Sequence, residues 1–303
     1  MKLLLTGAFN WTDEHIKELE KVGCEILFTE REDADIPFDV SNIDAVICNW
    51  LFVHHDITKF TNLKYIQLLS AGLDRVPLAY IKEKKIALSC ARGVYSIPMA
   101  EFAVCGVLQL YKNSCFFQRN QQEGVWQKNR DLLELAGKHV CIIGAGSVGT
   151  EVAKRFSAFT EEVYGIDLLP GENAYMKAVY SLEKLEKELN ISDVVILTLP
   201  LTDLTRNMFS TERFKQMKEG AVFVNISRGG LVDENAFAKA LDERLYGGVS
   251  DVFQEEPLPR DSVLWEKKNL IITPHNSFVS EKNDERMWKV IWNNLLRYKE
   301  DGQ

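Results

Sequence analysis

A glycine-rich loop, set between an apolar run and a helical pattern, constrains the fold of this chain more than any other feature. Gly144, Gly146 and Gly149 follow HVCII and precede TEVAKRFSAF in the spacing GxGxxG. Glycines in this place allow a tight turn, a close approach of backbone to a pyrophosphate and close packing of the next helix. The sequence therefore predicts a strand, a turn and a helix that bind a dinucleotide. The residues expected at the cofactor on this ground are Gly144, Gly146, Ser147, Val148 and Gly149.

An acidic residue at the end of the next apolar run indicates which dinucleotide is bound. The run EVYGID ends in Asp167. A carboxylate about 20 residues beyond the glycine loop accepts hydrogen bonds from the adenosine ribose hydroxyls and repels a 2′-phosphate. NAD is therefore the expected cofactor in preference to NADP, although Leu168 and Leu169 shape the same pocket. The alternative is a structural glycine turn beside a surface acid, which the agreement of strand, helix and acid in order disfavours.

Short apolar runs alternate with helical patterns along the whole chain, which is typical of an α/β protein with parallel sheets. A mostly apolar stretch from Met99 to about Gln121, after Pro98, predicts one long helix that another surface must cover. The last helical pattern, from Glu281 to Tyr298, is too short to be a domain and is expected to pack on the first one. The expected strands lie in KLLLT, CEILF, DAVICNW, YIQLLSAG and IALSC, and then in HVCIIGAG, EVYGID, DVVILTLP, AVFVNIS, GGVSDV and NLIIT.

Length and charge limit the class of protein. The 303 residues, 46% hydrophobic and 26% charged, are enough for two soluble domains. A net charge of -8 argues against nucleic acid or an anionic membrane as partner, while small anionic substrates need only local positive charge. No apolar run of about 18 residues and no signal peptide are visible, so a cytoplasmic protein is expected. The six cysteines show no metal-ligand spacing, predict no metal site, and are expected to be reduced core residues.

Three polar residues stand at the ends of apolar runs in the second half of the chain. They are Arg228 in NISRGG, Glu256 in DVFQEEP and His275 in IITPHNSF. Each alone is more often structural: an arginine before a glycine turn, a loop carboxylate beside a proline, a histidine where a strand stops.

From about Leu135 onward the sequence closely resembles the D-isomer-specific 2-hydroxyacid dehydrogenases. The stretches that carry the resemblance are LAGKHVCIIGAGSVG, LTLPLTDLTRNMF, MKEGAVFVNISRGGLVDENAFAKAL, DVFQEEPLP and NLIITPH. In the first part of the chain the resemblance is thinner and rests on LLSAGLDRVPL and GVYSIPMAEF. It implies a Rossmann NAD-binding domain, residues 96–275, inserted in a discontinuous flavodoxin-like substrate domain, residues 1–95 and 276–303. It also implies a homodimer, supported by the long apolar helix.

The resemblance assigns roles to individual residues. Arg228 would bind the carboxylate and polarise the carbonyl of a small 2-keto acid, and His275 would donate the proton that follows hydride transfer. Glu256, rather than the neighbouring Glu255, would hold His275 and favour its imidazolium form. Further residues implied at the cofactor are Pro200, Thr202, Ile226 and Asp251, the last either at the nicotinamide or as a turn cap; those implied at the substrate are Ala71, Gly72 and Tyr95.

Some features leave the substrate open. Asn276, Ser277 and Phe278 follow the histidine where the family commonly has small residues, and a glutamate at 256 argues against formate. Phosphoglycerate, glyoxylate, hydroxypyruvate, pyruvate and branched keto acids differ by only a few kcal/mol of pocket contacts. Two other functions stay in view: an NAD-sensing, corepressor-like interaction protein that keeps this fold, and a Rossmann methyltransferase, which would have no use for the three polar residues. Turnover of NADH separates them.

Overall fold

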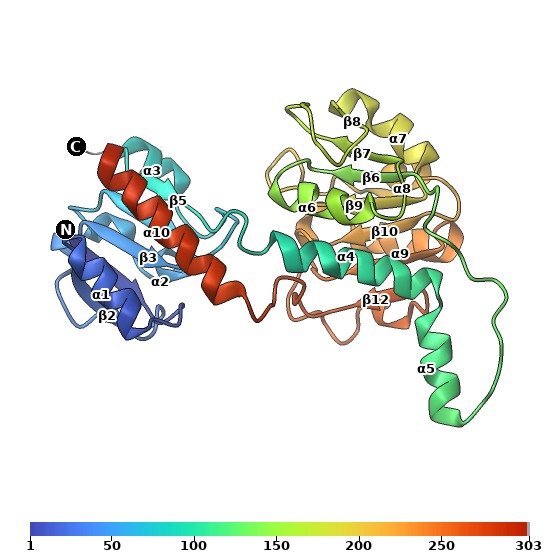
Figure 1. Ribbon diagram of the computed structural model, residues 1–303, viewed down its shortest axis with the longest axis horizontal. Helices are drawn as coiled ribbons and strands as arrows, with labels where there is room; N and C mark the ends of the chain where they lie inside the picture. Colours follow the sequence, from blue (N-terminus) through green and yellow to red (C-terminus); the bar gives the residue numbers. More distant parts are fainter. Residues whose placement is uncertain (302–303) are drawn as a thin grey trace. The chain divides into compact units, whose positions relative to one another are not determined.

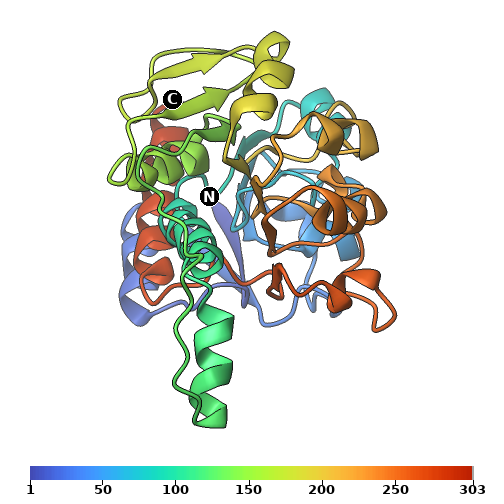
Figure 2. The ribbon, with the colours of Figure 1, turned by 90° about the vertical axis from the view of Figure 1, so that its right-hand side faces the viewer.

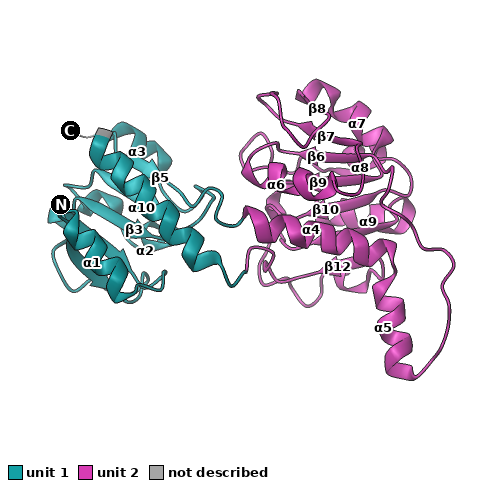
Figure 3. Cartoon of the chain, viewed as in Figure 1, with its two compact units in different colours: residues 1–95, 280–303 teal, residues 96–279 magenta. Residues whose placement is uncertain are grey.

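A computed structural model describes residues 1–301 of the chain. It contains two compact units (Figure 3). The first comprises residues 1–95 with the C-terminal segment from residue 280, and the second comprises residues 96–279. The chain thus leaves the first unit, builds the second and returns, and both units are α/β as predicted (Figure 1).

The first unit is built on a parallel sheet with the strand order β2-β1-β3-β4-β5. This order is the flavodoxin-like one. The strands are β1 (Lys2–Thr6), β2 (Glu25–Thr29), β3 (Ala45–Cys48), β4 (Tyr65–Leu68) and β5 (Ala87–Ser89). The helices are α1 (Asp13–Lys21), α2 (Leu51–His54), α3 (Leu78–Glu83) and α10 (Asn283–Asp301), with short 3-10 turns η1 (Val40–Asn42) and η2 (Ile57–Lys59).

Helix α10 belongs to the first unit because its apolar stripe completes that unit's core. Met287, Ile291 and Leu295 are buried at helical spacing and pack in one cluster with Leu3 and Leu5 of β1. The expectation that the last helix returns to the first domain is therefore confirmed. The strands β3 and β4 are buried along their whole length, which explains why both appear in the sequence as continuous apolar runs.

The second unit has a seven-stranded parallel sheet of order β12-β11-β10-β9-β6-β7-β8. The order reverses between β6 and β9, as in doubly wound dinucleotide-binding folds. Its strands are β6 (Val140–Ile143), β7 (Val163–Ile166), β8 (Ala178–Tyr180), β9 (Val194–Leu197), β10 (Val222–Asn225), β11 (Gly247–Ser250) and β12 (Leu270–Ile272). Its helices are α4 (Ser96–Tyr111), α5 (Ser114–Glu123), α6 (Ser147–Phe156), α7 (Leu185–Ile191), α8 (Thr211–Gln216) and α9 (Glu234–Glu243), with 3-10 turns η3 (Leu182–Lys184), η4 (Gly229–Leu231) and η5 (Val263–Glu266).

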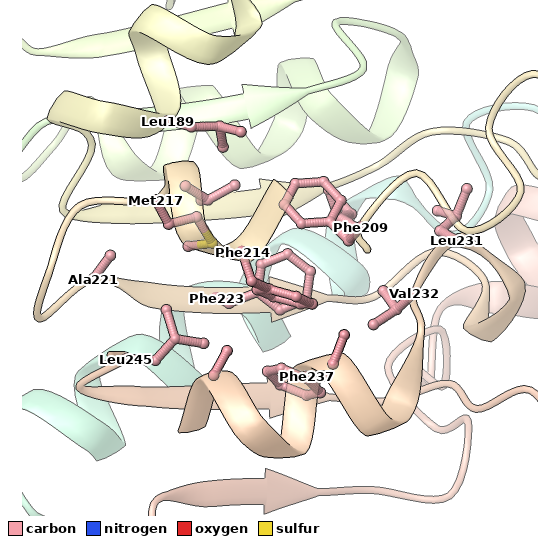
Figure 4. Close-up of a cluster of buried hydrophobic side chains, with 14 of the residues drawn as sticks. Leu189, Phe209, Phe214, Met217, Ala221, Phe223, Leu231, Val232, Phe237 and Leu245 are labelled. Atoms are coloured by element: carbon pink, nitrogen blue, oxygen red, sulfur yellow. The ribbon is translucent and has the colours of Figure 1, made fainter. Parts of the chain in front are cut away.

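Apolar clusters cover both faces of this sheet. On one face the rings of Phe214, Phe223 and Phe237 lie with centroids 5.1 to 5.5 Å apart, together with Leu189 and Met217 (Figure 4). On the other face α4 and α6 pack against the strands. Burial on both faces explains why the inner strands appear in the sequence as continuous apolar runs.

Three expectations from the sequence were wrong in detail. The stretch from Met99 to Gln121 is not one helix, because Asn113 adopts a left-handed φ of 49° and divides α4 from α5. Helix α4 also begins at Ser96, before Pro98, and α5 projects from the body of its unit (Figures 1 and 2). Cys105 and Cys115, expected in the core, are exposed on these two helices. In a helix that is apolar almost all round, the sequence does not show which face is covered.

Strand β8 was not predicted. It has three residues, all half-buried, at the edge of the sheet, and its apolar stretch AVY lies between Lys177 and Ser181. Within residues 1–301, no helix is long and apolar enough to cross a membrane.

Candidate functional site

The glycine loop has the shape that a bound pyrophosphate requires. Gly144 has a φ of 105°, which side chains rarely adopt, and a Cβ at Gly149 would lie 1.9 Å from the carbonyl oxygen of Gly144. A Cβ at Gly146, the N-cap of α6, would meet nothing within 4 Å. Backbone N–H groups at the start of a helix favour an anion. The loop therefore fits a dinucleotide, with open space at the middle glycine.

Asp167 lies directly after β7 and is tied to the same loop. Its carboxylate accepts hydrogen bonds from the backbone N–H of Ala145 at 2.7 Å and of Leu169 at 3.0 Å. Leu168 and Leu169 are exposed and carry no positive charge that could bind a 2′-phosphate. The carboxylate thus stands beside the phosphate-binding turn, where an adenosine ribose lies in folds of this kind.

The other predicted cofactor residues differ in exposure. The hydroxyl of Ser147 is 2.9 Å from that of Ser96, and Val148 packs against the core. Pro200 and Thr202 are exposed on the loop after β9, where the Thr202 N–H donates to the hydroxyl of Thr205. Ile226 follows β10 but is only 1% exposed. Its contact with a cofactor stays a prediction, as do the others.

His275 and Glu256 form a pair. The His275 Nδ1 lies 2.7 Å from Glu256 Oε2, and the other carboxylate oxygen accepts from the N–H of Phe253 at 2.9 Å. His275 has a left-handed φ of 51°, and its own N–H donates to the carbonyl of Asp251 at 2.7 Å. Because Glu256 engages Nδ1, Nε2 is the nitrogen that the ring can present to a ligand. About a third of each side chain is accessible to solvent, 35% in both cases.

Asp251 holds the backbone that carries His275. It is fully buried, and its carboxylate accepts from the Thr273 hydroxyl at 2.6 Å and from the N–H groups of Asn276 at 2.8 Å and Ser277 at 2.9 Å. The sequence suggested a cofactor contact or a turn cap for this residue. The hydrogen bonds are those of a turn cap, on both sides of His275, and a contact with the nicotinamide stays a prediction.

Arg228 is held on the loop after β10. Its guanidinium donates from Nη1 to the carbonyl of Ser227 at 2.8 Å. The buried Asn225, which the sequence reasoning missed, donates to the Arg228 carbonyl at 3.0 Å and accepts from the Ser227 N–H at 3.1 Å. The sequence did offer a signal for Asn225, because it is a polar residue at the end of an otherwise apolar strand. The next residue, Gly229, has no room for a Cβ, which would lie 1.9 Å from the backbone of Phe253.

Sheet topology brings the predicted polar residues to one edge of the second unit. Arg228 follows β10, Asp251 and Glu256 follow β11, and His275 follows β12, and these three strands are neighbours in the sheet. The glycine loop follows β6 at the point where the strand order reverses. Carboxyl ends of parallel strands lie at one edge, and ligands of doubly wound sheets bind there. Among residues 1–301, no group of His, Cys, Asp and Glu is placed to hold a metal ion.

The predicted substrate residues lie in the first unit, also at carboxyl ends of strands. Ala71 and Gly72 follow β4, and the hydroxyl of Ser70 closes this turn by donating to the Gly72 carbonyl at 2.9 Å. The hydroxyl of Tyr95 donates to the carbonyl of Leu69 at 2.6 Å. Burial raises the pKa of Tyr95 to about 12, so its hydroxyl stays protonated and able to donate at neutral pH. Tyr95 thereby braces the turn that would meet a substrate carboxylate.

Comparisons with known proteins bear on the family of this chain. The family model described as the NAD-binding domain of D-isomer specific 2-hydroxyacid dehydrogenases matches residues 104–277. The (S)-sulfolactate dehydrogenase of Chromohalobacter salexigens is 31% identical over 80% of this chain and 79% of its own length. The hydroxypyruvate reductase of Thermotoga maritima is 34% identical over 71% of this chain and 70% of its own. A D-isomer specific 2-hydroxyacid dehydrogenase from Xanthobacter autotrophicus, solved with NADPH and MES, superposes with a TM-score of 0.82 at 26% identity, covering 100% of this chain and 95% of that one.

The glycine loop, the doubly wound sheet and these relatives define an NAD-dependent oxidoreductase. The chain belongs to the D-isomer-specific 2-hydroxyacid dehydrogenase family, which confirms the resemblance seen in the sequence. The second unit is its NAD-binding domain.

Proposed function

We propose that this protein reduces a small 2-keto acid to the D-2-hydroxy acid, with His275 as the general acid. The observation that carries the proposal is the 2.7 Å contact between His275 Nδ1 and Glu256 Oε2 at the edge of the sheet that holds the glycine loop. A ring held by one nitrogen presents the other for proton transfer. Relatives whose names describe action on hydroxy or keto acids support the substrate class.

Each polar residue has one task in this proposal. The planar guanidinium of Arg228 binds the substrate and draws electron density toward the carbonyl oxygen. NADH, when bound, supplies a hydride to the carbonyl carbon. His275 donates the proton that the oxygen then needs, and in the oxidative direction it accepts that proton. Glu256 orients the ring and stabilises its charged form, while Asp251 fixes the backbone around it.

The first unit would supply the contacts that orient the substrate. Backbone N–H groups at Ala71 and Gly72 suit a carboxylate, because a turn with a glycine lets a ligand approach the main chain. Tyr95 would line the same place while its hydroxyl holds Leu69. Residues 1–95 with the C-terminal helix are on this proposal the substrate domain.

Replacing Glu256 by glutamine tests the observation that carries the proposal. E256Q removes the charge beside His275 but keeps the size of the side chain, and we expect kcat to fall about 100- to 10,000-fold, by analogy with other enzymes whose histidine is oriented by a carboxylate. Steady-state NADH consumption measures the change. Glu255 is the matched control, since it is the exposed neighbour in the same loop. Equal activities of E256Q and E255Q would refute the pairing.

The cofactor preference is expected to depend on Asp167. D167A removes an acceptor for ribose hydroxyls and a charge that repels a 2′-phosphate, so the ratio of kcat/KM for NADPH to that for NADH should rise about 10- to 100-fold. D203A, at an exposed acidic position on another loop of the same unit, should keep the wild-type ratio. If D167A keeps that ratio as well, Asp167 does not select the cofactor.

We also propose a homodimer in which α4 and α5 form the contact. An apolar hollow on this side of the second unit is lined by Val104, Cys105, Leu108 and Phe159, and Trp126, which follows α5, is 97% exposed. Apolar side chains that stay exposed in this way are typical of an interface. Sedimentation should show a dimer at micromolar concentration, and a single monomeric species would contradict it.

Six free thiols favour a reducing, cytoplasmic location.

A further inference from the structure

We propose that Arg75 forms a second anion-binding position in the first unit, so that the preferred substrates are 2-keto acids with another anionic group, such as a carboxylate, sulfonate or phosphate. This role rests on the proposed reduction of keto acids and specifies its substrate class. Arg75 lies three residues after Gly72, on the turn that would bind the 2-carboxylate.

The guanidinium of Arg75 contacts two side chains that follow β3. It lies over the ring of Trp50, 3.8 Å from the centroid, and donates from Nη1 to the side-chain oxygen of Asn49. Trp50 is 44% exposed, so this stacked pair stands at the surface of the unit and not in its core. Stacking on an aromatic face and a fork of N–H donors are the features by which arginine recognises planar or tetrahedral anions.

A network of hydrogen bonds around Glu32 holds the residues that position Arg75. The carboxylate of Glu32 accepts from the hydroxyl of Thr6 at 2.7 Å and from the N–H groups of Asn49 at 2.7 Å and Trp50 at 2.5 Å. Three donors thus occupy this carboxylate and fix the turn after β3.

Arg75 also lies close to the predicted substrate residues. It follows β4, while Asn49 and Trp50 follow β3, the neighbouring strand. Burial raises the pKa of Tyr95, and the positive charge of Arg75 acts in the opposite direction, so the two side chains are within electrostatic reach. The carboxyl edge of the first sheet therefore combines a turn for one carboxylate with a cation near it. A keto acid with a single anionic group would bind to the turn but would leave the cation of Arg75 without an anionic group of the substrate.

The preference for keto acids with a second anionic group tests the proposed role of Arg75. Oxaloacetate and 3-sulfopyruvate carry a second anionic group, while pyruvate and hydroxypyruvate do not, and wild type should prefer the first pair. In R75Q the ratio of kcat/KM for oxaloacetate to that for pyruvate should fall about 10- to 100-fold, as expected for a lost charge-assisted hydrogen bond. R75K, which keeps the charge without the stacked fork, should retain part of the ratio. R297Q, at an exposed arginine on α10, is the matched control and should keep the wild-type ratio.

A binding measurement separates this role from the proposed reaction. Calorimetry with NADH present compares D-malate with D-lactate, and R75Q should weaken D-malate binding selectively, while melting temperature reports folding. Turnover of keto acids with no preference for a second anion, or an equal loss for both classes in R75Q, overturns the role of Arg75 and leaves the reaction standing. Selective loss of D-malate binding without any turnover overturns the reaction and supports the anion position.

Discussion

H275A is expected to lower kcat for keto-acid reduction about 100- to 10,000-fold, because the carbonyl oxygen loses its proton donor. The imidazole is held by Glu256 on one side, and the backbone around it is fixed by the buried carboxylate of Asp251. Alanine removes the ring without touching the glycine loop. The affinity for NADH, measured by the change in its fluorescence on binding, should therefore stay close to that of wild type.

The matched control for H275A is a histidine outside the site. His54, exposed at the end of α2, can be replaced by alanine with no expected loss of activity. If H275A instead retained a kcat within about threefold of wild type, its role in proton transfer would be wrong, since so small a change corresponds to well under 1 kcal/mol of barrier.

R228Q should lower kcat/KM about 1,000-fold, because the substrate loses both a charged partner and the polarisation of its carbonyl. The backbone carbonyl of Arg228 accepts a hydrogen bond from Asn225, which R228Q leaves in place, so the change should not displace the loop. R228K should recover only part of the loss, since an ammonium lacks the planar fork. R260Q, at an exposed arginine after Glu256, is the control. A loss confined to NADH affinity would place Arg228 at the cofactor instead.

Much of the fold followed from the sequence because its main strands are buried on both faces. Runs such as HVCII and DVVIL are apolar from end to end, and a glycine loop after the first of them admits few architectures. Strand β8 was missed: its apolar stretch is only AVY, between Lys177 and Ser181. The break at Asn113 was missed because asparagine tolerates a left-handed φ that no apolar pattern reveals.

The positions of candidate site residues that directly follow strands could be predicted from the sequence. The hydrogen bonds that join residues far apart in the chain could not. The positions of Arg228, Glu256 and His275 after successive strands could be seen in the sequence. The hydrogen bonds of Asp251 to Asn276 and Ser277 span 25 and 26 residues and could not. The same holds for Arg75, whose stacking on Trp50 depends on the pairing of β3 with β4.

Consumption of NADH with a panel of 2-keto acids, followed by chiral analysis of the product, tests the central claim most directly. The panel contains glyoxylate, pyruvate, hydroxypyruvate, oxaloacetate, 3-sulfopyruvate and a branched keto acid. We expect turnover of at least one of them, a D-2-hydroxy acid wherever the product is chiral, and loss of that turnover in H275A. Protein that binds NADH but consumes none of it with any of these acids would contradict the proposed function and favour an NAD-sensing role.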